Sequence, residues 1–332
     1  MARILSQHRG IALVSACSAL AVLPATAHHS SAMFDMSKEI VVEGTVTEFS
    51  WKNPHSYITV KTANGPQVLE LGPPSTLNPL GLRRDAIHVG DKIKIRAAPP
   101  RRGTMALGRE LIRADGSTLP LMIGGAAKLP TPTAQAETIA GTWVPEGFFK
   151  FLASRASWPL TEKGRAALKV ADIKNSTQAQ CIPVGAPMLM QYPAVNRIEV
   201  GKDVVKLHID WLDAERVVYM DGRKPPAKGK PTLQGFSTGK WEGKTLVVDT
   251  THFAEHREGL ALGIPSGLGK HLVERFSLTN EGRQLTYEFV VEDPEYLTAP
   301  VQQSLLWNYS PDLKPSGVKC DVKSASRYLK EE

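Results

Sequence analysis

The chain has 332 residues, a formal net charge of +7 and 42% hydrophobic residues, which is typical of a globular protein long enough for two domains. Its basic residues are scattered, apart from short pairs such as Arg83-Arg84 and Arg101-Arg102, whereas nucleic-acid binding proteins usually concentrate them on one face. We therefore expect no nucleic-acid partner.

The first 27 residues have the pattern of a secretory signal peptide. Arg3 and Arg9 precede an apolar run, Ile11 to Val22, that is shorter than the about 20 residues a membrane-spanning helix needs. The run is followed by a small-x-small cleavage site, Ala25-Thr26-Ala27. We expect a mature chain that begins at His28 and is periplasmic or secreted. No later segment is apolar over a length that would span a membrane.

Three cysteines occur in the chain, and two of them remain after cleavage at Ala27. Cys17 ends the stretch Val14-Ser15-Ala16-Cys17, which also resembles a lipobox, so the alternative is a lipoprotein anchored at Cys17. Cys181 and Cys320 form an even number in an oxidising compartment, and we expect them to form a disulfide. It would close a loop of about 140 residues and stabilise the fold by roughly 4–5 kcal/mol in the chain-entropy model. The alternative is two separate buried thiols.

Residues 28–122 are predicted to form a small β domain. The Asn64-Gly65 pair between the second and third strand-like runs is the strongest short signal for a hairpin. Five short strands with one longer excursion between the third and fourth favour an OB-like β-barrel, and a five-strand sandwich is the alternative. The expected strands are Glu39–Ser50, Tyr57–Thr62, Gln67–Leu71, Lys92–Ala97 and a last pair around Asp115-Gly116.

Residues 123–137 are rich in Gly, Ala, Pro and Thr and are predicted to link the first domain to a second, residues 138–325. One helix is expected from Thr161 to Val170, with Thr161 as N-cap and Glu162 in the first turn. Beyond Ala194, seven or eight strand-like runs follow at short, regular spacing. They predict a larger antiparallel β-barrel or curled sheet, so the whole fold is expected to be mainly β.

The mature N-terminus is a candidate metal site. His28 would offer both its α-amino nitrogen and its imidazole to one ion, and His29 can complete a T-shaped site like the histidine brace of copper proteins. His55, in a turn of the same domain, is the expected third partner. The predicted metal is copper or zinc. The alternative is a polar terminus without a ligand and a His55 that serves only its turn.

Several polar side chains of the second domain are candidates for acid–base catalysis, because burial moves such groups toward a neutral pKa. Residues two apart on a strand share a face, so Asp249 and His252 lie on opposite faces, and Glu274 lies opposite His271 and Arg275. The alternative is that these charged groups face water, as is usual on antiparallel strands. The candidates for lining a ligand pocket are Trp211, Tyr219 and Trp241.

Two parts of the chain resemble known families. The stretches HHSSAMFD and VVEGTVTEFSWKNPHSYITV, marked by His28-His29-Ser30 and Trp51-x-Asn53-Pro54-His55, resemble an exported bacterial family, domain-of-unknown-function family 6152, over about residues 28–120. The second half is similar to uncharacterised exported proteins that share C-x-P-x-G-x-P, YMDGR, GxWEGxTLVVDTT and VERF stretches. Gly141-Thr142-Trp143 resembles the G-x-W opening of lipocalins, which implies a calycin-like barrel. Neither resemblance implies an activity.

Three functions fit these features. The leading prediction is a periplasmic binding protein whose C-terminal barrel encloses a small apolar molecule, because a barrel of this size can hold one small ligand. The first alternative is an enzyme of the cell envelope, either copper-dependent at His28 or acid–base in the barrel, although no complete catalytic motif such as G-x-S-x-G is present. The second alternative is a structural envelope protein.

Overall fold

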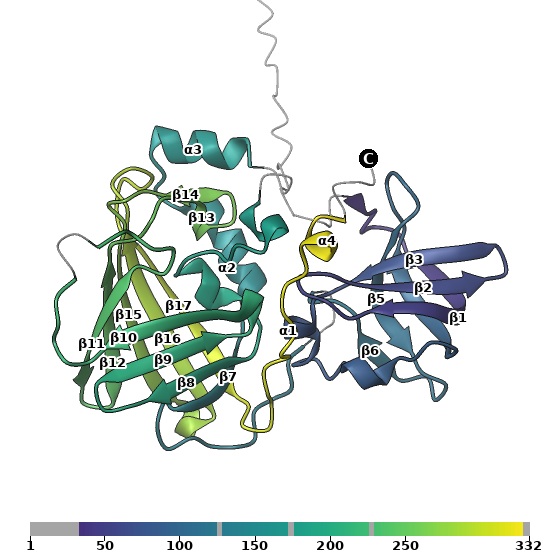
Figure 1. Ribbon diagram of the computed structural model, residues 1–332, viewed down its shortest axis with the longest axis horizontal. Coiled ribbons are helices and arrows are strands. Elements are labelled where there is room, and N and C mark those ends of the chain that lie inside the picture. The colour runs from purple at the N-terminus through teal and green to yellow at the C-terminus, as the bar shows by residue number, and fades with distance from the viewer. Residues whose placement is uncertain (1–32, 125–127, 172–175, 226–228, 328–332) are drawn as a thin grey trace, which may run out of the picture.

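The structure, a computed structural model, is mainly β and contains two closed β-barrels. It describes residues 33–124, 128–171, 176–225 and 229–327. The barrels lie side by side, and the last described segment of the chain passes between them (Figure 1). None of the described helices is long and apolar enough to cross a membrane. The predicted small and larger β-barrels are therefore both confirmed.

The smaller barrel is formed by the N-terminal part of the chain and has the connectivity of an OB-fold. Its strands are β1 (Ile40–Ser50), β2 (Ser56–Thr62), β3 (Gly65–Leu71), β4 (Lys92–Ala98) and β5 (Ala106–Ile112), with β6 (Thr118–Pro120) added beyond β5. β1 pairs with β2 and β4, and β5 closes the circle between β4 and β3. Five strands cannot all alternate in direction around a circle, so one neighbouring pair, β3 and β5, is parallel.

The core of the smaller barrel is filled from inward-facing positions of its strands, as the alternating sequence pattern predicts. The chain between β3 and β4 forms α1 (Pro74–Leu77) and η2 (Arg84–Ala86), which is the longer excursion expected from the sequence. Leu77 and Leu82 of this excursion are fully buried against the barrel. The main strand contributions to the core are Val42, Val46, Ile58, Val60, Leu69, Leu71 and Ile95.

The larger barrel is formed by nine strands of the C-terminal part. In order around the circle they are β7 (Gly141–Pro145), β8 (Asn196–Val200), β9 (Val204–Ile209), β10 (Ala214–Tyr219), β11 (Phe236–Glu242), β12 (Thr245–Thr251), β15 (His271–Thr279), β16 (Gln284–Glu292) and β17 (Val301–Tyr309). Nine is also an odd number, so here too one pair is parallel. It is the seam between β10 and β11, paired at Val218↔Ser237 and Tyr219↔Thr238.

Two of the nine strands were not expected from the strand pattern. β7 is only five residues long, and β17 begins with Val-Gln-Gln-Ser, which lacks regular alternation. Both strands are held by tertiary pairing, because β7 lies between β17 and β8 and closes the circle. The local sequence preference for a strand is weak compared with such pairing.

The Gly141-Thr142-Trp143 stretch begins β7. Trp143 is fully buried, donates from Nε1 to the carbonyl of Ile139 at 2.9 Å, and packs on Tyr309 with ring centroids 4.9 Å apart. Gly141 has a φ of 141°, and a Cβ at this position would lie 2.9 Å from Cε2 of Tyr309. The glycine is therefore required for the tryptophan and the tyrosine to meet at the closure of the barrel.

Short helices and one hairpin lie around the larger barrel. The predicted helix is α3 (Glu162–Lys169), and Thr161 caps it by accepting at Oγ1 from the Gly164 amide at 3.1 Å. The hairpin of β13 (His256–Ala261) and β14 (Ile264–Ser266) packs near α3 at one end of the barrel (Figure 1). The other helical elements are α2 (Phe148–Ser154), η3 (Arg155–Ser157), η5 (Thr177–Gln180), η6 (Met188–Gln191), η7 (Trp211–Asp213), η8 (Asn280–Gly282) and α4 (Val322–Ala325).

Candidate ligand-binding cleft

A cleft of about 1340 Å³ lies between the two barrels. Both barrels and α4 line it, and most of the lining side chains are apolar or aromatic. Phe149 is 48% exposed, so part of this apolar surface is open to solvent. The apolar and aromatic lining includes Leu71, Leu80, Leu107, Met122 and Ile123 on the N-terminal side, and Phe148, Phe149, Leu152, Tyr192 and Trp211 on the C-terminal side.

Three aromatic rings form a cluster in the C-terminal wall of the cleft. Tyr192 lies flat on Trp211, with ring centroids 4.0 Å apart and an interplanar angle of 6°. The ring of Phe148 is tilted by 33° against that of Tyr192, with centroids 5.1 Å apart. Gln178 fixes the stack, because its Oε1 accepts from the Tyr192 hydroxyl at 2.9 Å and from Trp211 Nε1 at 2.7 Å. The wall is therefore preorganised, with these polar atoms already satisfied and Tyr192 itself buried at 4% exposure.

Polar groups lie buried behind Gln178. Ser176 donates from Oγ to Oε2 of Glu258 at 2.8 Å, and Oγ1 of Thr177 lies 3.0 Å from Nε2 of His256. Burial raises the pKa of Glu258 and lowers the pKa of His256 to about 4, so His256 is neutral near pH 7. Its Nδ1 accepts from the Glu258 amide at 3.0 Å, which leaves the proton on Nε2 as a donor to Thr177. His256 therefore cannot act as a base toward the Thr177 hydroxyl.

Charged groups of both signs surround the apolar part of the cleft. Arg109 donates to the carbonyl of Met36 at 2.6 Å and lies 3.8 Å from Glu39. Lys128 and Lys150 also line the cleft and are exposed. Because acidic and basic side chains are interspersed, the cleft selects no single charge, and recognition there depends mainly on apolar contact.

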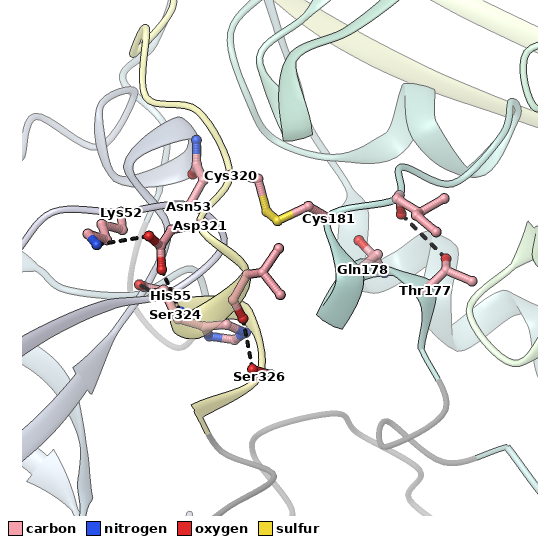
Figure 2. The surroundings of a disulfide bond; sticks show 12 residues. Lys52, Asn53, His55, Thr177, Gln178, Cys181, Cys320, Asp321, Ser324 and Ser326 are labelled. Atoms are coloured by element: carbon pink, nitrogen blue, oxygen red, sulfur yellow. Dashed lines mark hydrogen bonds and ion pairs between the residues drawn. A yellow bond between two sulfur atoms is a disulfide. The ribbon is translucent and has the colours of Figure 1, made fainter.

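The C-terminal tail, residues 310–327, follows β17; Ser310 and Ser316 still bond to the larger barrel, and the segment from Val318 onward lies against the N-terminal barrel (Figure 2). The amide of Asp321 donates to the carbonyl of Asn53 at 2.9 Å, and Nδ2 of Asn53 donates to the carbonyl of Val318 at 2.6 Å. Lys52 and Asp321 form an ion pair at 2.9 Å. Farther along, the hydroxyl of Tyr57 donates to the carbonyl of Ser324 at 3.2 Å. The second half of the tail is therefore bound to the N-terminal barrel.

The predicted disulfide between Cys181 and Cys320 is confirmed. Cys320, in the tail, forms a β-bridge with Asn53 of the N-terminal barrel. Cys181 directly follows η5 in the C-terminal part of the chain (Figure 2). The bond thus joins the tail, held by the N-terminal barrel, to the wall of the cleft that carries Gln178. It connects residues 139 positions apart in the sequence.

His55 lies in the cleft but is engaged by other residues. Its Nδ1 is 2.9 Å from Oε1 of Glu70, and its carbonyl accepts from Oγ of Ser324 in the tail. The Trp51-x-Asn53-Pro54-His55 stretch therefore has a structural role as a dock for the tail. No group of three or more His, Cys, Asp and Glu within the described ranges is arranged to hold a metal ion. His28 and His29 lie outside those ranges, so the metal site that includes them stays a prediction.

The interior of the C-terminal barrel, where the sequence predicted a ligand, is occupied by side chains of the barrel itself. Trp307, Phe276, Phe289 and Tyr287 are at most 1% exposed. Their rings contact one another, with centroids of Phe276 and Tyr287 5.1 Å apart and those of Tyr287 and Trp307 5.4 Å apart. These four buried rings pack against one another within the core of the larger barrel.

An ion pair lies buried among these rings. Arg216 on β10 donates to both carboxylate oxygens of Glu274 on β15, at 2.8 and 2.6 Å, and the two residues are 1% and 0% exposed. The hydroxyl of Tyr287 also donates to Glu274, at 2.8 Å, and Arg216 reaches Oγ1 of Thr250 at 3.4 Å. The carboxylate therefore has three donors, as a buried charge requires.

The structure does not bring the other sequence-predicted catalytic candidates together with Glu274. His271 and Arg275 share the outer face of β15, as predicted, and Nε2 of His271 lies 3.2 Å from the Asp249 carboxylate on β12. Arg275 forms an exposed ion pair with Glu242 at 2.9 Å. His252 is exposed and its Nδ1 contacts the neighbouring Thr251 hydroxyl.

Of the three predicted ligand-binding aromatics, only Trp211 lines the cleft. Tyr219 stacks on Phe236 with ring centroids 5.1 Å apart, and Arg223 lies over its ring at 4.2 Å. Trp241 is 44% exposed on β11. Tyr219 and Trp241 therefore belong to the surface of the larger barrel.

Sequence reasoning missed Phe148, Tyr192 and Gln178, which build the C-terminal wall of the cleft. Phe148 and Phe149 belong to the apolar stretch Gly147-Phe-Phe-Lys-Phe-Leu152, which lies outside the run of strands and was a detectable signal. Gln178 had no such signal, because its importance comes from the two side chains that it contacts. Buried Lys270 was also missed. It donates to the carbonyls of Ala186 and Gly259 at 2.8 and 3.0 Å.

Comparison with known proteins assigns only the N-terminal part. Residues 15–108 match a family of unknown function, DUF6152. The match ends within β5 and includes the dock for the tail, and it confirms the resemblance predicted from that stretch. No curated protein matches the chain.

A solved structure of a mutant of the fluorescent protein UnaG is similar to part of the chain at 12% identity. The alignment covers 52% of this chain and 96% of that protein. The TM-score is 0.26, so this likeness carries no inference about fold or ligand. The resemblance of the C-terminal part to lipocalin-like exported proteins stays a prediction.

Proposed function

We propose that this protein is an exported binding protein that holds a small, largely apolar molecule in the cleft between its barrels. The observation that carries the proposal is the cleft itself, about 1340 Å³ lined mainly by apolar and aromatic side chains from both barrels. Ligand sites commonly occur at such interfaces and have this composition. Export is supported by the signal-peptide pattern at residues 1–27 and by a disulfide, which is typical of oxidising compartments.

The cleft is a better site than the interior of the C-terminal barrel, which the sequence suggested. A ligand in the barrel would have to displace Phe276, Tyr287 or Trp307, and each of these rings is fully buried. A ligand in the cleft displaces only water from surface that already lies open, such as Phe149. Burying one such aromatic side chain contributes about 1.5–3 kcal/mol. The acid–base alternative has less support, because His256 beside the cleft is held as a donor.

The test uses the dye anilinonaphthalene sulfonate, an apolar anion, and two substitutions matched in exposure. Phe149→Asp places a charge in the cleft, and Trp241→Asp places one on the outer face of the larger barrel, where the aromatic side chain is 44% exposed against 48% for Phe149. We expect one saturable dye site in the unmodified protein and an affinity about tenfold lower in Phe149→Asp, because 1.4 kcal/mol corresponds to tenfold.

The control should keep the affinity of the unmodified protein within about twofold, a difference of roughly 0.4 kcal/mol. Equal losses in both variants would indicate nonspecific surface binding, and an unchanged Phe149→Asp would place the dye outside the cleft. Either result would contradict the proposal.

A further inference from the structure

We propose that the Cys181–Cys320 disulfide is a redox-controlled latch on the cleft, an inference that rests on the proposed function. Reduction of this bond frees the wall formed by η5 and lowers the affinity of the cleft for its ligand. The partner that the latch requires is a dithiol, either a small molecule or an exposed pair of protein thiols.

One side of the latch is part of the cleft wall. Ser176, Gln178 and Ala179 line the cleft, and Cys181 ends the same turn, where its amide donates to the carbonyl of Gln178 at 3.0 Å. Gln178 holds the stacked rings of Tyr192 and Trp211. A displacement at Cys181 is therefore transmitted through one short turn to the stacked rings that a ligand would contact.

The other side of the latch is fixed to the opposite barrel. Cys320 pairs with Asn53, and the next residue, Asp321, is held by the Asn53 carbonyl and by Lys52 (Figure 2). These contacts do not involve the sulfur atoms, so they keep the tail on the N-terminal barrel after reduction. The disulfide adds a covalent tie across a junction where α4 packs against η5, and Ala325 of α4 itself lines the cleft. The hydrogen bonds that Ser176, Thr177 and Gln178 form with the larger barrel also do not involve the sulfur atoms, so the proposed loosening of η5 consists of the loss of its tie to the tail.

The chemistry is a reversible thiol–disulfide exchange. Cys181 and Cys320 are both partly exposed, so a thiolate can reach the bond. Attack on one sulfur gives a mixed disulfide and releases the other cysteine as a thiolate. The second thiolate of the reductant then displaces the first cysteine. In total the protein disulfide gains two electrons and two protons and becomes two thiols, while the dithiol loses them and becomes a disulfide.

The first experiment needs no ligand. Amide hydrogen exchange is measured on the full chain before reduction, after reduction by dithiothreitol and after reoxidation. We expect the amides of Cys181 and Ile182, which donate to Gln178 and Thr177, to exchange at least tenfold faster in the reduced protein and to recover on reoxidation. The β15–β16 ladder is the internal control and should not change. Equal protection of η5 in both states would overturn the latch, and so would a loss of protection spread over the whole larger barrel.

The second experiment measures binding of anilinonaphthalene sulfonate to the oxidised protein, to the reduced protein and to the double variant Cys181→Ser, Cys320→Ser. We expect the affinity to fall at least fivefold on reduction, and the double variant to bind weakly whether or not dithiothreitol is present. The same affinity in all three states would overturn the latch while leaving the proposed function intact. No cleft-specific binding by the oxidised protein would overturn the proposed function, whereas the exchange data would still decide whether η5 is released.

Discussion

Replacing Glu274 by Gln should destabilise the larger barrel strongly without any change of shape. Glu274 and Arg216 are 0% and 1% exposed, and the carboxylate accepts two hydrogen bonds from the guanidinium and one from Tyr287. Glu274→Gln keeps the volume but removes the negative charge, so Arg216 remains as a buried cation without a counter-ion. Breaking a buried pair in this way costs about 3–5 kcal/mol.

The matched control is the next residue on the same strand. Arg275 faces outward and pairs with Glu242 at 2.9 Å, and the two side chains are 42% and 41% exposed. Arg275→Gln should cost no more than about 1 kcal/mol, because exposed pairs are solvated and screened. Urea unfolding followed by circular dichroism measures both changes. If Glu274→Gln lowered the free energy of unfolding as little as Arg275→Gln does, the buried ion pair would not stabilise the larger barrel as inferred.

A double replacement separates the net contribution of the ion pair from the cost of breaking it. Arg216→Met with Glu274→Leu removes both charges and leaves an apolar interior, which is often neutral or stabilising at buried pairs. We expect this double variant to be more stable than Glu274→Gln alone by about 2 kcal/mol or more. A double variant as unstable as the single one would show that packing and the hydrogen bond of Tyr287, rather than the unpaired charge, dominate.

Three further predictions concern pH, metal binding and domain independence. Asp210 is 4% exposed and accepts from Ser316, and burial raises its pKa from an ordinary 3.8 to about 6. The folded state therefore binds this proton more tightly than the unfolded state does. The free energy of unfolding should rise by roughly 3 kcal/mol as the pH falls from above 6 to below 4. Asp210→Asn should flatten that part of the profile in thermal unfolding, and an unaltered profile would assign the pH dependence to other groups. If the His28 amine and imidazole bind copper, one extra alanine before His28 should weaken copper affinity at least a hundredfold by isothermal titration, whereas equal affinity in both forms would reduce the two histidines to a polar terminus. A chain that begins at Thr138 should still unfold cooperatively when followed by circular dichroism, and insolubility or a broad, noncooperative transition would count against two independent domains.

The sequence predicted the barrels better than the cleft because the two features arise at different levels. Alternation of side chains is a local property, so it showed that Glu274 faces away from His271 and Arg275, and it located most of the strands. Alternation does not tell which strands are neighbours or that a charged residue such as Glu274 lies on the buried face, because both depend on how the barrel closes. The disulfide could be predicted from the sequence for a different reason: two cysteines in an oxidising compartment allow only one pairing.

The cleft could not be predicted from the sequence, because it is assembled from segments that are far apart in the chain. Phe148, Gln178, Tyr192 and Trp211 belong to different elements, and no spacing rule connects them. His55 of the Trp51-x-Asn53-Pro54-His55 stretch was interpreted as a metal ligand, which stays a prediction, but the contact of this stretch with a tail that follows more than 260 residues later was not foreseen. A motif that serves a distant part of its own chain carries no local sign of its partner.

The dock for the tail also sets an order of events during synthesis. The hydroxyl of Tyr57 is bound by a carbonyl 267 positions later. At about 5–20 residues per second, the ribosome adds the intervening chain in roughly 10–50 seconds. Once β5 has been made, the N-terminal barrel has all five of its strands but still lacks the segment that covers part of its surface. Later in the same interval Cys181 is present without Cys320. The barrel that is made first is therefore completed only after the second barrel has been made.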